Sequence, residues 1–140
     1  MDLKLKEKVI IRHFTPENFI AWQKLYENAE LWQEKGFDYV PIEPIVAYTP
    51  GSDGLVNVYA SVLDLTYSQW SRMTSKFHSE LQTDLSIILA TLKEKDYRHG
   101  HPHGNNFCLR FFRDENGKVM FDKKPRVYLI DFDRAASLPK

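Results

Sequence analysis

Two short stretches of the chain, residues 99–106 and 130–133, carry the side chains best suited to chemistry. The first reads HGHPHGNN and the second reads IDFD, and their chemically active side chains are His99, His101, His103, Asn106, Asp131 and Asp133. A neutral imidazole accepts a proton near pH 7, and imidazoles and carboxylates are also metal ligands. These residue types therefore suit proton transfer or metal-assisted chemistry.

The alternating histidines suggest one specific alternative, a zinc site. His99, His101 and His103, together with a carboxylate such as Asp131, would give a ligand set of the kind found in zinc hydrolases. Histidine triplets arise easily by chance, however. This interpretation also leaves Asn106 unexplained, as well as the Asp-Phe pair that ends an apolar run.

An apolar hairpin separates the two stretches. Residues 107–113 are expected to form a strand, 118–121 to return, and 126–132 to form a further strand that delivers Asp131 to its end, because these runs are rich in apolar β-formers. The sequence Asp-Glu-Asn-Gly at 114–117 has the residues that a type I′ turn favours.

The first half of the chain is expected to form a small sheet packed against one helix. Residues 8–14 and 55–65 read as strands. Pro41 and Pro44 limit residues 40–48 to an edge strand, because proline cannot donate a ladder hydrogen bond.

The helix of this half is expected over residues 16–35. Thr15 is a suitable N-cap, and Pro16 suits the first helical position. Its apolar face at three-or-four spacing consists of Phe19, Trp22, Tyr26, Ala29 and Gln33. Gly36 then ends the helix.

Two more helices are expected before the histidine-rich stretch. One opens near Thr66 and breaks at residues 74–75, and its shared face is Tyr67, Trp70 and Met73. The longer one runs to about Lys95, with an apolar stripe of Phe77, Leu81, Leu85, Ile88 and Leu92. The order of strand, helix, strands, helices and hairpin indicates an α+β fold and not repeating βαβ units.

Composition sets the remaining bounds. A chain of 140 residues is the size of one domain, and its 19 basic and 19 acidic residues give no reason to expect nucleic acid or an anionic membrane as a partner. Cys108 is the only cysteine, and no apolar run reaches the length of a membrane span. These features predict an intracellular protein, cytoplasmic or nuclear.

The motifs resemble those of the protein-kinase-like superfamily, in particular its aminoglycoside-phosphotransferase and atypical small-kinase branches. Those branches use a loop HGDxHxxN followed by IDFD or IDFG. Residues 99–106 match the first histidine, the glycine, the second histidine and the asparagine, and Ile130 to Asp133 match the later motif. His101 stands where the family has its catalytic aspartate.

The resemblance extends upstream and covers nearly all of the chain. Val9 to Arg12 falls at the family's VAIK strand with Arg12 in the lysine's place, and Glu27 or Glu30 would supply the ion-pair partner. Residues 1–65 then correspond to a small-lobe-like part and 66–140 to a truncated large-lobe-like part of one domain. The Gly-rich loop and the later large-lobe helices have no counterpart in the sequence.

The resemblance implies a site for ATP and Mg²⁺. By analogy, His101, Asn106 and Asp131 are the catalytic positions, and Arg12, Glu27 and Glu30 are the nucleotide-binding ones. Asn106, Asp131 and Asp133 would hold the metal, so Asn106 and Asp131 must meet across one cleft.

The expected function is that of a pseudokinase or degenerate phosphotransferase. The imidazole of His101 can accept a proton but carries no negative charge to orient a hydroxyl beside a metal, so transfer is expected to be weak or absent. The alternatives are an active atypical kinase that uses His101, the histidine metal hydrolase, and a non-catalytic interaction module. Nucleotide and an unidentified acceptor or protein are the expected partners.

Overall fold

The computed structural model describes residues 8–95, 97–98, 106–130 and 136–137. The helices are α1 (Pro16–Tyr26), α2 (Ala29–Glu34), α3 (Tyr67–Met73) and α4 (His78–Glu94), with a short 3₁₀ turn η1 (Ser52–Gly54). The strands are β1 (Val9–Phe14), β2 (Ile45–Pro50), β3 (Val56–Ser61), β4 (Leu65–Thr66), β5 (Tyr97–Arg98), β6 (Phe107–Arg110), β7 (Arg126–Leu129) and β8 (Ala136–Ser137). The fold is α+β, as the sequence predicts.

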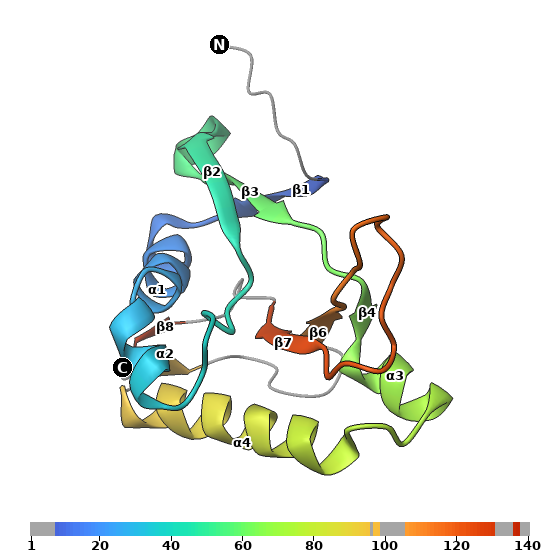
Figure 1. Ribbon diagram of the computed structural model, residues 1–140. Coiled ribbons are helices and arrows are strands. Elements are labelled where there is room, and N and C mark those ends of the chain that lie inside the picture. The colour runs from blue at the N-terminus through green and yellow to red at the C-terminus, as the bar shows by residue number, and fades with distance from the viewer. Residues whose placement is uncertain (1–7, 96, 99–105, 131–135, 138–140) are drawn as a thin grey trace.

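Small antiparallel sheets and helices are stacked in layers (Figure 1). The sheet β1-β3-β2 lies at one end of the molecule, α4 runs along the other, and the sheet β4-β6-β7 lies between them. α1 and α2 flank the first two layers on one side, and β5 pairs with β8 as a separate two-stranded ladder.

The first sheet confirms three strands in the first half of the chain, but the strand expected over residues 55–65 ends at Ser61, Leu65–Thr66 form β4 in the other sheet, and the edge strand expected over residues 40–48 begins only at Ile45. β3 is central and pairs with β1 from Val56 opposite Phe14 to Ser61 opposite Val9. Its Val58 and Ala60 are fully buried. β2 pairs with the other side of β3 and is an edge strand, which agrees with the prolines that precede it.

The single helix expected over residues 16–35 is wrong, because the chain makes two helices there. α1 ends at Tyr26, and the side chain of Asn28 caps α2 by accepting a hydrogen bond from the Leu31 amide at 3.2 Å. Asparagine in this position satisfies a helix-start amide and so begins a new helix. The face also changes: Ala29 and Gln33 are exposed, whereas Leu31 and Trp32 are buried.

α3 and α4 confirm the two helices expected before the histidine-rich stretch. Thr66 and Gln69 form a capping box at the start of α3, with side chain to backbone distances of 3.1 and 3.0 Å. The inward face of α4 includes Leu81, Ile88 and Leu92, all buried. Met73 is 67% exposed and does not share the buried face of α3 as expected.

The hairpin between β6 and β7 is less regular than expected. β6 ends at Arg110 and β7 at Leu129, and the predicted return strand is reduced to a single bridge between Arg113 and Val119. The Asp114 carboxylate organises the turn by accepting hydrogen bonds from the amides of Asn116 and Lys118, both at 2.9 Å. The side chain adds to backbone hydrogen bonds from the Asp114 amide to the Lys118 carbonyl at 2.9 Å and from the Met120 amide to the Phe112 carbonyl at 2.8 Å.

Backbone contacts join the two larger sheets into one core. The Leu129 amide donates to the Pro41 carbonyl at 3.0 Å, and the Glu43 amide donates to the Leu129 carbonyl at 2.9 Å. The segment before β2 therefore lies parallel to β7. Buried residues from both sheets and from all four helices form one hydrophobic cluster. In the part of the chain described, no helix is long and apolar enough to cross a membrane.

Candidate functional site

The structure describes part of the set of residues expected at the site. Arg12, Glu27, Glu30 and Asn106 are described. His101, Asp131 and Asp133 lie outside the described residues, as do His99 and His103 of the proposed zinc site. Their expected roles stay predictions.

Asn106 lies at the start of β6, directly against the end of β7. Its carbonyl accepts a hydrogen bond from the Ile130 amide at 2.8 Å, and the residue is only 7% exposed. The register that pairs Phe107 with Leu129 fixes this contact. The two motif segments, which are far apart in sequence, are therefore adjacent in space at Asn106 and Ile130, the residue that precedes Asp131.

Arg12 makes an ion pair with a residue that the sequence interpretation missed. Its Nε donates to Glu43 Oε2 at 2.9 Å, and the Glu43 side chain is 3% exposed while that of Arg12 is 26% exposed. The expected partner, Glu27 or Glu30, is wrong: in the described part of the chain the Arg12 ion pair is formed with Glu43. A signal for Glu43 was present, since it is a lone acid in the apolar run Val40 to Val46.

The backbone around Glu43 is held by two separate elements. Its carbonyl accepts a hydrogen bond from Trp22 Nε1 of α1 at 2.8 Å, and its amide is bound to Leu129 of β7. Trp22 is completely buried. A buried carboxylate is costly unless it is paired, so this rigid placement also fixes where the Arg12 guanidinium must lie.

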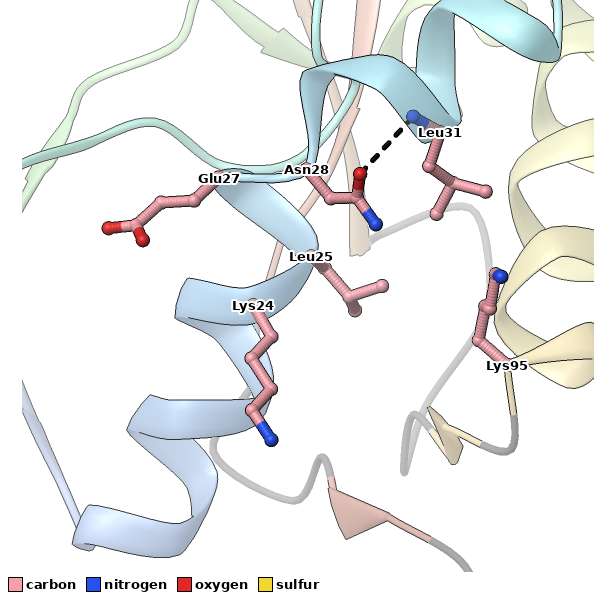
Figure 2. Close-up of a pocket in the computed structure, with 6 residues that line it drawn as sticks. All are labelled: Lys24, Leu25, Glu27, Asn28, Leu31 and Lys95. Atoms are coloured by element: carbon pink, nitrogen blue, oxygen red, sulfur yellow. Dashed lines mark hydrogen bonds between the residues drawn. The ribbon is translucent and has the colours of Figure 1, made fainter.

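Glu27 and Glu30 lie where α1 ends and α2 begins. Glu27 is the C-cap of α1 and accepts a hydrogen bond from Gln23, its neighbour one turn earlier, at 3.2 Å. Figure 2 shows Glu27 extending away from Leu25 and Leu31 at the rim of a hollow that Lys24, Asn28 and Lys95 also line. Glu30 is an exposed residue in the first turn of α2. Both carboxylates are therefore exposed side chains at helix ends.

Cys108 is a partly buried residue of β6. Burial is the main cause that raises the pKa of its thiol to about 11, the Glu43 carboxylate raises it further, and Arg12 opposes this. A thiol with this pKa is protonated at neutral pH and is a poor nucleophile.

The hydrogen bonds above define the inter-sheet junction, the set Arg12, Glu43, Asn106 and Ile130, and Cys108 lies two residues after Asn106 on β6. The junction contains one cation near the surface, one buried carboxylate and one buried amide residue. Its Ile130 directly precedes Asp131 in the sequence. A guanidinium is suited to phosphate and carboxylate groups. Within the described ranges, no group of three or more histidine, cysteine or acidic side chains is placed to hold a metal ion.

Comparison with known proteins finds a similarity of fold to solved structures. No family model and no curated protein matches the chain. Among 41 matching chains of solved structures, one comes from the crystal structure of the yeast RNA Pol II CTD kinase CTDK-1 complex, with 14% sequence identity and a TM-score of 0.52. The match covers 96% of this chain and 41% of the other, so this chain spans less than half the length of that neighbour.

Proposed function

We propose that the chain is a reduced kinase-like domain, of pseudokinase or degenerate phosphotransferase type, which binds ATP with Mg²⁺ at the inter-sheet junction. The observation that carries this proposal is the hydrogen bond of 2.8 Å between the Ile130 amide and the Asn106 carbonyl. It supports the proposal because the kinase-like motifs require the asparagine and the Asp-Phe segment to meet. The fold likeness to a chain of a kinase complex points the same way.

In this proposal Arg12 contacts the phosphates and Glu43 orients Arg12. The guanidinium is partly exposed and paired on one side with a carboxylate that is almost fully buried. Arginine presents several donors in a planar fork, so it can bond a carboxylate and a phosphate at the same time. Asn106 and Asp131 would hold the magnesium, with Asp133 as a further oxygen ligand.

Phosphoryl transfer is proposed to be weak or absent because of His101. A kinase loop uses a carboxylate to orient the substrate hydroxyl and accept its proton. An imidazole accepts a proton near neutral pH but adds no negative charge beside the metal. The domain would then serve chiefly to bind nucleotide, with an unidentified acceptor or protein partner.

Calorimetric titration with ATP, with and without Mg²⁺, tests the binding proposal. We expect saturable binding that is tighter with Mg²⁺.

ATP hydrolysis and autophosphorylation are then compared between the wild type and His101→Asp, with His78→Asp on α4 as a matched control. The first substitution is expected to raise turnover about tenfold or more, because it restores a positioned general base. The proposal fails if ATP does not bind in either condition.

A further inference from the structure

A pocket of about 420 Å³ lies where the end of α1 and the segment before β2 meet β6 and β7, next to the inter-sheet junction. Its lining consists of Tyr26, Tyr39, Val40, Pro44, Arg110 and Tyr128. Pro44 follows Glu43 in the chain, and Arg110 lies two residues beyond Cys108 on β6. The pocket is thus a separate space beside the junction and is lined by none of the residues expected to bind nucleotide.

Arg110 is the one cationic side chain among the described lining residues of the pocket. Arg110 donates a hydrogen bond to Ser61 Oγ at the end of β3, and its guanidinium lies over the Tyr128 ring at 5.5 Å. These contacts hold the group in place between the sheets. None of the described lining residues carries a carboxylate, so this part of the lining attracts anions.

The aromatic walls are held in place as well. The Tyr39 hydroxyl accepts a hydrogen bond from the Val127 amide at 2.8 Å and donates to the Val127 carbonyl at 3.1 Å. The rings of Tyr39 and Tyr128 are 5.3 Å apart at an angle of 53°. The Arg126 guanidinium lies over the Tyr39 ring, 5.0 Å from the ring centroid. A site with walls fixed in this way binds a flat ligand with little loss of conformational entropy.

We propose that this pocket binds a planar aromatic monocarboxylate. Tyrosine rings, Val40 and Pro44 offer apolar and aromatic surface for a flat ring, and the guanidinium matches a carboxylate in geometry and charge. The volume falls in the range of small-molecule sites, which are mostly apolar with a few fixed polar groups. This site does not depend on nucleotide binding at the junction.

Ligand-observed NMR with two matched probes tests the proposal on the wild-type protein. Indole-3-acetate carries the carboxylate, and indole-3-acetamide has the same ring without the charge. We expect saturable binding of the acetate and about tenfold weaker binding of the amide, since a charge-assisted hydrogen bond is lost. In protein-observed spectra, aromatic resonances of Tyr39 and Tyr128 should shift as the acetate is added.

Two substitutions sharpen the test. Arg110→Gln should weaken acetate binding about tenfold and remove the preference over the amide, whereas Arg72→Gln, an exposed arginine on α3, should change neither. Thermal unfolding shows whether Arg110→Gln is folded, and the wild-type comparison of the two probes is decisive if it is not. Equal binding of both probes, or no binding of the acetate at about 5 mM, would overturn the proposal.

Discussion

Two arginine–carboxylate pairs differ in burial. Arg12–Glu43 joins β1 to the segment before β2, and Arg113–Asp64 joins the hairpin after β6 to the segment after β3. In the Arg12–Glu43 pair the atoms are 2.9 Å apart and the carboxylate side chain is 3% exposed. In the Arg113–Asp64 pair they are 2.7 Å apart, and the two side chains are 41% and 24% exposed. The same chemistry is thus present once with a buried carboxylate and once with both side chains partly exposed.

The structural contacts of the exposed Arg113–Asp64 pair are enough to explain its presence. Asp64 also accepts a hydrogen bond from the Phe111 amide at 2.8 Å, and its own amide donates to Leu109 at 2.8 Å. It therefore fastens the linker after β3 to the end of β6. No ligand is needed to explain Arg113.

The buried pair is harder to explain by stability alone. Removing the Glu43 carboxylate from water is costly, and well-packed apolar residues often serve stability as well or better. A charged group retained at such a place is a candidate for a functional role. The comparison therefore supports a ligand-directed role for Arg12 and a structural role for Arg113.

The largest expected effect is on the buried pair. Arg12→Leu should lower the free energy of unfolding by about 3 kcal/mol, because it removes the guanidinium from a carboxylate that stays buried. The double substitution Arg12→Leu with Glu43→Leu should recover most of this loss but still bind no ATP. Urea denaturation measures the stability and calorimetry the binding. A double variant that binds ATP like the wild type would contradict the assigned role.

A neutral polar contact provides an intermediate reference for the comparison. β7 is an edge strand, and Tyr39 satisfies both backbone groups of Val127 there. Tyr39→Phe should lower the free energy of unfolding by about 2 kcal/mol, because it leaves a buried amide and carbonyl without this partner. Tyr48→Phe on β2 is the matched control, since Tyr48 is 52% exposed and should have little effect. Equal losses in the two variants would show that the Tyr39 hydroxyl is not important.

The smallest expected effect is on the exposed pair, and it depends on pH. Burial alone would raise the pKa of Asp64, but hydrogen bonds from Arg113 and from the Phe111 amide outweigh it, so the pKa lies below its usual value. Such a carboxylate stabilises the fold above its unfolded-state pKa, and this contribution is lost as the pH falls through the lower folded-state pKa.

Asp64→Asn should therefore cost about 1 kcal/mol at pH 7, and the difference from the wild type should shrink below about pH 4. Urea denaturation at pH 7 and pH 3 measures both values. Asp122→Asn, an exposed carboxylate in the hairpin, is the control and should not change the pH dependence. A loss that stays constant between the two pH values would mean that the charge of Asp64 does not matter.

Sequence periodicity predicted the regular elements and failed where side chains act locally. β1, β3 and α4 follow from their apolar patterns. The break after α1 does not, because the apolar spacing continues across it while Asn28 caps a new helix. The exposed Met73 shows the same limit, since three-or-four spacing identifies a helix face but not how far the core extends along it.

The candidate site was predictable in its motifs but not in its ion pair. The proximity of Asn106 to Ile130 agrees with the spacing of the two motifs. The partner of Arg12 was sought on a helix, where charge spacing is easily recognised. Glu43 instead follows an irregular segment, and only the contacts of that segment with Trp22 and Leu129 direct its side chain toward Arg12.

A crystal structure of the protein with ADP and Mg²⁺ would test the central claim most directly. The account predicts that the diphosphate lies within hydrogen-bond distance of the Arg12 guanidinium, with the metal ion between the side chains of Asn106 and Asp131. A nucleotide bound elsewhere, with the Arg12–Glu43 pair unchanged and distant from it, would contradict the account.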